Sequence, residues 1–244
     1  MSIDLYPALD AGETDVAVAL ERVASAGRVA PLGAASLLHR NDDARWPEEL
    51  GNDLATRFPG VSYTNLAADG ATIGDVFGEQ LPQLRATDEP TIVTLTIGTS
   101  DLFSAFGNRP KASLLEQIVR DIAEAFDFLI DAVRLARRNS LLIVSTIYDP
   151  SDRSGRIPEE SGRLPLRALD LFNADIRKLA GGTPGLRLAE VYGHFLGHGA
   201  TAPESDRWYW HRSLLEPNAR GAHEIRRVWM DAVTAAEIVE GQRR

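Results

Sequence analysis

The chain has 244 residues, 44% of them hydrophobic, so it can bury a substantial core within one domain of ordinary size. Its formal net charge of −9 disfavours nucleic acids and anionic membranes as partners, because binding phosphate groups requires a concentrated positive field. The chain lacks cysteine and any apolar run of membrane-spanning length, which excludes disulfides, thiolate chemistry and a transmembrane helix. We expect a single domain over residues 1–244. No signal peptide is evident, which favours the cytoplasm, although a segment missing before Met1 would be the place for one.

Alternating strand and helix patterns run along the chain. Short apolar runs rich in β-branched residues or leucine predict four strands, at Val61–Ala67, Thr91–Ile97, Ser140–Thr146 and Leu186–Glu190. Apolar residues at steps of three and four predict helices at Val16–Ala26, Trp46–Arg57, Ile73–Leu84, Leu115–Arg138 and Leu164–Leu179, and a last helix that begins near Asn218. Strands that alternate with helices imply an α/β fold, in which helices cover both faces of a parallel sheet.

Local signals mark the ends of two of these helices. Ser113 and Glu116 have the spacing of a capping box, so the helix that follows should begin at about Leu115. The segment Gly181–Gly185, with the sequence GGTPG, predicts a turn after the helix Leu164–Leu179.

Small and polar residues follow two of the predicted strands. The run TIVTLTIGTSDLF (Thr91–Phe103) passes from an apolar strand into a Gly-Thr-Ser-Asp turn, and YTNLAADGAT (Tyr63–Thr72) reaches a turn at Gly70 in a similar way. Ligands bind outside the carboxyl ends of the strands in open α/β sheets. The two loops therefore predict a site that stabilises an oxyanion.

Both runs resemble sequence blocks of the SGNH (GDSL-like) hydrolases, which have a flavodoxin-like three-layer α/β/α sandwich and mostly cleave esters with a serine nucleophile. NLAADGAT is similar to the second block, which implies that the Gly70 N–H helps to form the oxyanion hole. TLTIGTSDLF is similar to the third block, with Ser100 where the family has an asparagine donor. A serine hydroxyl can donate but is shorter, and losing one such donor typically costs about 10²–10³ in rate. Asp101 is expected to hold this loop by accepting from local backbone.

The nucleophile has three candidate positions under this resemblance. The family opens with a strand that ends in Gly-Asp-Ser, and some relatives continue with a segment similar to Met1–Pro7. On this alignment, which we favour, the nucleophile would stand immediately before Met1, and Val29–Leu32 would be the nearest segment to replace the missing first strand. A competing alignment matches Leu32–Ser36 to a degraded first block and makes Ser36 the nucleophile. Ser2 is the least favoured candidate.

The general base also departs from the family pattern. The family has Asp-x-x-His before the last helix, whereas Ser213 and Glu216 stand at these positions here. Histidine suits proton transfer at neutral pH, and His198 in a glycine-bearing loop after the last strand is the first choice. Asp206 or Glu216 would orient its imidazole, and His211 is the second choice.

Each assignment has a structural alternative. Gly70 is also explained as a turn residue with a positive φ, and Ser100 as a cap of the helical turn that follows. His194 and His198 could pack as structural residues, and no third ligand completes a zinc pattern with them. We therefore expect no metal and no cofactor.

Two functions from different classes follow from these residues. The first is a serine-type ester hydrolase acting on a small-molecule ester, inactive as this chain if the nucleophile segment is absent. The second is a noncatalytic relative that binds a small ester or glycan in the same pocket. Nucleotide binding is disfavoured because no Gly-x-Gly-x-x-Gly loop follows a strand. The loops Arg153–Arg163 and Gly199–Leu214 are expected to shape the pocket, and the sequence indicates neither the acyl group nor the oligomeric state.

Overall fold

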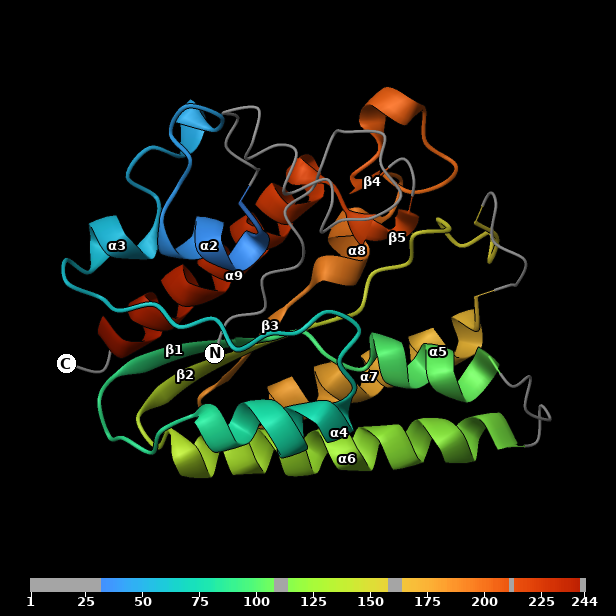
Figure 1. Ribbon diagram of the computed structural model, residues 1–244, viewed down its shortest axis with the longest axis horizontal. Coiled ribbons are helices and arrows are strands. Elements are labelled where there is room, and N and C mark those ends of the chain that lie inside the picture. Colours follow the sequence, from blue (N-terminus) through green and yellow to red (C-terminus); the bar gives the residue numbers. More distant parts are fainter. Residues whose placement is uncertain (1–31, 108–113, 158–163, 211–212, 242–244) are drawn as a thin grey trace.

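The computed structural model describes residues 32–107, 114–157, 164–210 and 213–241 (Figure 1). Its centre is a parallel sheet of the strands β1 (Thr91–Leu95), β2 (Ser140–Ser145) and β3 (Leu186–Ala189), in that order. Thr91 pairs with Ser140, and Leu142 pairs with Leu186. The sequence prediction of these three strands and of their parallel arrangement is confirmed.

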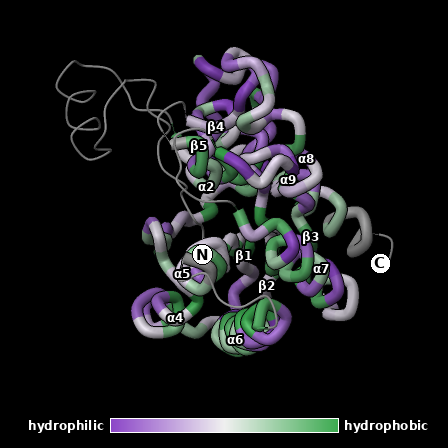
Figure 2. The backbone as a smooth tube through the Cα atoms, turned by 90° about the vertical axis from the view of Figure 1, so that its right-hand side faces the viewer, coloured by the Kyte–Doolittle hydropathy of each residue, from purple (hydrophilic) through white to green (hydrophobic). Residues whose placement is uncertain are grey.

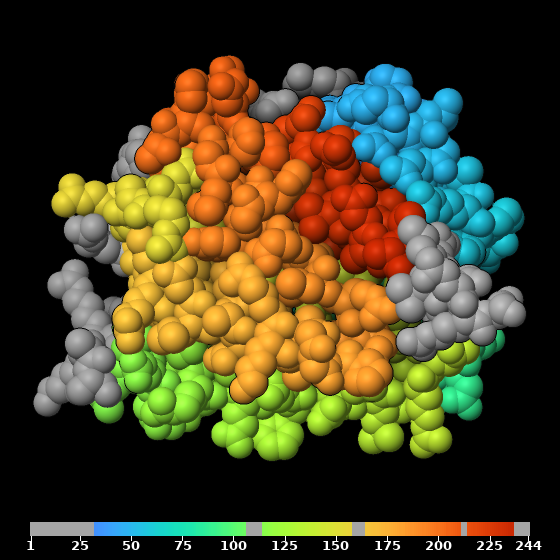
Figure 3. Space-filling model, turned by 180° about the vertical axis from the view of Figure 1, so that it is seen from behind, coloured from blue at the N-terminus to red at the C-terminus, as the bar shows by residue number. Residues whose placement is uncertain are grey.

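Helices cover both faces of this sheet, as Figure 2 shows in a view along the layers. Strand residues alternate between the two faces. Leu142 and Val144 belong to the core on the side of α6 (Leu115–Ala136) and α7 (Leu166–Gly182). Ile143 belongs to the core on the side of α2 (Ala34–His39) and α9 (Ala219–Gly241). The three-layer α/β/α architecture is thereby confirmed. From behind, α9 lies between the α2 region and the segment around α8 (Val191–Phe195) (Figure 3).

The predicted strand Val61–Ala67 is wrong. This segment is irregular, and a bridge at Asn65 is its only strand-like residue. Val61 and Tyr63 are 38% and 36% exposed, so their apolar side chains do not form a buried strand face.

The long predicted helices are confirmed, with small shifts at their ends. Gly181 and Gly182 form the last turn of α7, and the chain reverses at Gly185, which has a φ of +80°. Asn218 caps α9, because its Oδ1 accepts from the Gly221 N–H at 3.0 Å. Ser113 and its predicted capping box lie outside the described residues.

The shorter predicted helices are broken into pieces. The range 46–57 holds a 3₁₀ turn, η1 (Pro47–Glu49), and α3 (Leu54–Arg57), separated by Gly51 with a φ of +77°. The range 73–84 consists of α4 (Ile73–Asp75), a π-helical turn η2 (Val76–Gln80) and η3 (Leu81–Gln83). The predicted helix Val16–Ala26 and most of Val29–Leu32 lie outside the described residues.

The helices α2, α5 (Thr99–Gly107) and α8 were not predicted, and neither were three further elements that follow α8. They are the 3₁₀ turn η5 (Glu204–Asp206) and the antiparallel pair β4 (Tyr209–Trp210) and β5 (Ser213–Pro217). Among the described helices, none has both the length and the apolar character that crossing a membrane requires.

Candidate active site

The loop after β1 turns abruptly into α5 (Thr99–Gly107). Gly98 has a φ of +112°, and a Cβ atom there would lie 2.8 Å from Cζ of Phe172 and closer still to Cε1. Only glycine fits both constraints. Thr99 and Ser100 consequently occupy the first turn of α5, where the helix dipole favours negative charge.

The loops around positions 70 and 100 meet at Asp101. Its carboxylate accepts from the Ile73 N–H at 3.1 and 3.2 Å, so α5 is tied to the start of α4. Burial raises the pKa of Asp101, and the hydrogen bonds from the backbone offset this only in part. Asp101 therefore joins the two loops through a contact with distant rather than local backbone, and its role toward substrate stays a prediction.

Gly70 lies in an exposed turn just before α4. Its φ is +66°, and the Ala71 N–H donates to the Ala68 carbonyl at 3.4 Å across the turn. A Cβ at Gly70 would meet no atom within 4 Å, so the space beside it is open. The positive φ is sufficient reason for a glycine at position 70. The role of the Gly70 N–H as an oxyanion donor stays a prediction.

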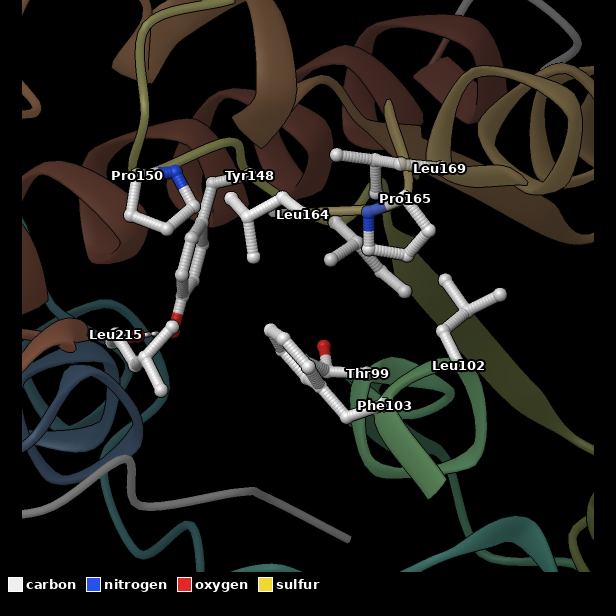
Figure 4. Close-up of a pocket in the computed structure, with 10 residues that line it drawn as sticks. Thr99, Leu102, Phe103, Tyr148, Pro150, Leu164, Pro165, Leu169 and Leu215 are labelled. Carbon is white, nitrogen blue, oxygen red and sulfur yellow. Dashed lines mark hydrogen bonds between the residues drawn. The ribbon is translucent and has the colours of Figure 1, made fainter. Parts of the chain in front are cut away.

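An apolar pocket opens between α5 and the segment that follows β2 (Figure 4). Phe103 and Leu102 approach it from α5, and Tyr148 stands on the opposite side. The empty volume is about 410 Å³ with its open mouth included. The pocket is lined by Thr99, Leu102, Phe103, Ile147, Tyr148, Pro150, Leu164, Pro165, Leu169 and Leu215.

The expectation that the loops Arg153–Arg163 and Gly199–Leu214 form the pocket stays a prediction, because residues 158–163 and 211–212 lie outside the described residues. Within the described residues, the lining side chains come from positions that flank these loops, such as Pro150, Leu164 and Leu215. Tyr209, which lies in the second of these loops, is 2% exposed and belongs to the core on the α9 side.

Carboxyl groups lie at the Leu215 end of the pocket. Tyr148 donates its hydroxyl to the Leu215 carbonyl at 3.2 Å. Burial raises the pKa of Tyr148, and the negative charges of Glu216 and Asp69 raise it further. Burial also raises the pKa of Glu216, again with a contribution from Asp69. The two carboxyl groups are therefore close enough to interact beside Tyr148.

His198 is held by its backbone and by its ring. Its Nδ1 lies 3.0 Å from the main-chain carbonyl oxygen of Asp206, and its imidazole stacks on Trp208 at 3.6 Å between centroids. The Asp206 carboxylate, which was predicted to orient the His198 ring, accepts from the Ser205 hydroxyl. The contact with the ring is made by the main-chain carbonyl of Asp206. A carbonyl oxygen only accepts, so Nδ1 carries the proton and Nε2 is the basic nitrogen of the neutral ring.

His194 has a different environment. Its Nε2 lies 2.9 Å from Oε2 of Glu224, which also pairs with Arg220 and Arg227. Burial alone would raise the pKa of Glu224, but the hydrogen bond from His194, the nearby His223 ring and the two arginines hold this pKa far below its ordinary value. Within the described residues, no group of three or more His, Cys, Asp or Glu side chains is suited to hold a metal ion.

The candidate nucleophile Ser36 is the third residue of α2, whose N-cap is Gly33. Its hydroxyl lies 3.3 Å from the Tyr63 hydroxyl. Among the described residues, the His194 ring bonds to Glu224 and the His198 ring to the Asp206 carbonyl, while His39 stacks on Tyr63 and His223 on Trp46. Ser2 and His211 lie outside the described residues. The identity of the nucleophile and the roles of His198 and Asp206 stay predictions.

The sequence matches the model of the GDSL-like lipase/acylhydrolase family over residues 25–223. The chain belongs to this family. Its structure is similar to a lipase from a goat rumen metagenome, with 15% identity, a TM-score of 0.53 and coverage of 82% of this chain and 87% of that one. It is also similar to a member of the lipolytic protein G-D-S-L family from Veillonella parvula, with 18% identity, a TM-score of 0.50 and coverage of 74% and 84%. At these identities the likeness concerns the fold. No curated protein matches the chain.

Membership in the GDSL-like family confirms the resemblance found in the sequence blocks. The matched range includes Ser36, Gly70, Ser100 and Glu216 and leaves Ser2 outside.

Two residues of this region were not singled out from the sequence. Tyr148 and Asp152 follow β2, and the polar run Tyr148–Arg153 after a predicted strand is the same signal that identified the loop after β1. That signal could have found them.

Proposed function

We propose that the protein is an ester hydrolase of the GDSL-like family whose substrates carry an apolar acyl group. The pocket beside α5 carries the proposal. Its walls are mainly leucine, proline and aromatic side chains. Binding there is favourable for an apolar acyl chain, which leaves water, and unfavourable for a charged group, which would lose its hydration. Thr99, at the start of α5, brings the helix N-terminus to the edge of the same pocket.

The chemistry proposed for this site is acyl transfer through serine. A serine hydroxyl attacks the ester carbonyl carbon while a histidine, for which His198 Nε2 is suited, accepts the hydroxyl proton. The Gly70 N–H and the Ser100 hydroxyl donate to the oxygen that becomes negative. The carbon–oxygen bond to the alcohol then breaks as the histidine returns the proton to the leaving oxygen. Water hydrolyses the acyl-enzyme by the same steps and restores the serine.

A series of aryl esters that differ only in acyl length tests the pocket's role. We expect kcat/KM to rise from acetate to octanoate. Phe103→Ala should lower kcat/KM for octanoate by roughly 10-fold and leave acetate nearly unchanged, because an apolar pocket contact discriminates by about 1–3 kcal/mol. Phe128→Ala is the matched control, since Phe128 is 61% exposed on α6 and does not line the pocket. Equal rates for all acyl lengths would contradict the proposal.

The nucleophile can be identified independently of acyl preference. A fluorophosphonate probe labels an activated serine, and peptide mass spectrometry shows which serine carries the label. Ser36→Ala and Ser2→Ala each remove one candidate. Abolished labelling in one variant would identify the nucleophile, and unchanged labelling in both would exclude these two serines.

A second function, binding of an ester without turnover, is favoured by one observation. Glu216 stands where the family has its histidine, and burial with the nearby Asp69 raises its pKa. A carboxyl group at this position takes the place of the imidazole that the family uses as general base, so the family's proton acceptor is missing from this position. Saturable binding of an octanoate ester, with no hydrolysis and no fluorophosphonate labelling, would favour this function over the first.

A further inference from the structure

We propose that Asp152 is a positioning residue for His198, holding the loop 197–201 so that the His198 imidazole is presented as a proton acceptor through Nε2. The catalytic consequence rests on the proposed ester hydrolysis. The positioning itself rests on the contacts of the loop that follows β2.

The Asp152 carboxylate binds the backbone on both sides of His198. One oxygen accepts from the Gly197 N–H at 2.9 Å and from the Gly199 N–H at 3.1 Å. The other accepts from Gly199 at 3.0 Å and from the Thr201 N–H and hydroxyl at 3.1 and 2.7 Å. A single side chain therefore fixes the residue before and the residue after the histidine.

Asp152 is itself fixed in an unusual backbone conformation. Asp152 and Arg153 have φ values of +49° and +69°, in the left-handed region that non-glycine residues rarely adopt. The buried Asp149 carboxylate holds this turn by accepting from the Ser151 N–H at 2.9 Å and the Arg153 N–H at 2.8 Å. Strain that persists under such support is typical of functional sites.

Glycine at position 199 lets the two loops approach. The Ala200 N–H donates to the Pro150 carbonyl at 2.8 Å, and a Cβ on Gly199 would lie 2.5 Å from that oxygen. Pro150 also lines the acyl pocket. The loop after β2 thus joins the pocket wall to the backbone of His198.

The ring of His198 is fixed by the segment that follows the loop. The carbonyl of Asp206 binds Nδ1, and Trp208 covers one face of the imidazole with an interplanar angle of 4°. The Trp208 N–H donates to the His198 carbonyl at 2.9 Å. The rotation and the tautomer of the ring therefore depend on the position of the backbone that Asp152 sets.

Asp152→Asn tests the proposal with little change in shape. Both carboxylate oxygens accept from backbone N–H groups, so either orientation of the new amide turns its NH₂ group toward donors. We expect the loop to shift and the ring to lose its contact with Asp206. Thr201→Val, which removes one donor and keeps the carboxylate, should have the same effect in a weaker form. Asp121→Asn, on an exposed part of α6, is the control for loss of one negative charge.

The first measurement is long-range nitrogen–proton correlation NMR of the His198 ring, which does not depend on activity. The unmodified protein and Asp121→Asn should show a single tautomer protonated at Nδ1, and Asp152→Asn should show a mixture. A single Nδ1-protonated tautomer in Asp152→Asn would overturn the proposal.

The second measurement is ester hydrolysis. Asp152→Asn should lower kcat by about 10²-fold with KM nearly unchanged, because misplacing a catalytic group affects the chemical step. An unchanged kcat in an active protein would also overturn the proposal. If the unmodified protein hydrolyses no ester while the tautomer changes in Asp152→Asn, the positioning role holds and the proposed function fails.

Discussion

The loops that follow β1 and β2 lie at the same edge of the sheet but are fixed by different means. The loop after β1 depends on shape, because Gly98 packs against Phe172, and Asp101 reaches across to the neighbouring loop. The loop after β2 depends on polar side chains. Asn173 binds both the N–H and the carbonyl of Ile147, and Asp152 accepts from three backbone N–H groups.

The two loops also differ in how they bind their carboxyl groups. Asp101 has one backbone partner outside its own turn, and burial raises its pKa. Asp152 has several donors on both oxygens, so its charge is solvated by the protein itself. The β1 loop should therefore be sensitive to added volume, and the β2 loop to the removal of polar groups.

Asn173→Leu should have the largest effect, and it tests the polar support of the β2 loop. Asn173 is 1% exposed, and its amide accepts from the Ile147 N–H at 2.7 Å and donates to the Ile147 carbonyl at 2.8 Å. Leucine leaves both groups buried without partners, so we expect a loss of about 2–6 kcal/mol in the free energy of unfolding, measured with urea. Asn65→Leu, at an exposed site, should cost less than about 1 kcal/mol. Equal losses of stability in Asn173→Leu and Asn65→Leu would contradict the view that buried polar contacts fix the β2 loop.

Gly98→Ala should be nearly as damaging, and it tests the shape dependence of the β1 loop. The new methyl group would collide with the Phe172 ring, and alanine disfavours a φ of +112°. Strain and overpacking together should cost about 2–5 kcal/mol. Gly78→Ala is the matched control, since a Cβ there meets no atom within 4 Å. Equal free energies of unfolding for Gly98→Ala and Gly78→Ala, measured with urea, would show that the β1 loop accommodates the added methyl group.

The parts of the fold that were predictable from the sequence are those indicated by a pattern of residues close together along the chain. The three central strands were predictable because their side chains are buried on both faces, as at Leu142 and Ile143. The turn before Asp101 was predictable because the motif Gly98–Asp101 is local, but the contact of Asp101 with Ile73, 28 positions away, was not. The hydrogen bonds of Asp152 with Gly197 and Thr201 join residues 45 to 49 positions apart, and no local sequence pattern predicts such contacts. Val61–Ala67 has strand-like residues but stays irregular and largely exposed, so composition alone misassigned it.

For the candidate site, the sequence supplied residues whose roles stay predictions, and it did not supply their contacts. The family blocks marked Gly70 and Ser100, and the glycine-bearing loop marked His198. The replacement of an orienting carboxylate by the Asp206 carbonyl was not predictable, because any residue supplies a carbonyl oxygen. Glu216 was recognised as a departure from the family, but its approach to Asp69 depends on tertiary folding.

Asp101→Asn should have a smaller effect that depends on pH, and it tests the difference between the two carboxyl groups. The folded pKa of Asp101 lies above its ordinary value of 3.8, so the folded state binds this proton more tightly than the unfolded state. The wild type therefore loses stability as the pH rises through 3.8 and then through the raised folded pKa. Asparagine does not titrate and keeps an acceptor for Ile73. The stability of the variant relative to wild type should increase from acid to neutral pH in urea titrations, and a constant difference would contradict the assignment.

Tyr148→Phe should have the smallest effect and probes the place where the β2 loop meets the pocket. The substitution keeps the aromatic wall and removes the hydroxyl that donates to the Leu215 carbonyl. One lost hydrogen bond costs about 0.5–1.5 kcal/mol, measured by urea unfolding. Acyl-length preference should stay the same, because the apolar surface facing the pocket does not change. A loss as large as that of Asn173→Leu would mean that this single hydrogen bond, rather than the set of buried polar contacts, fixes the β2 loop.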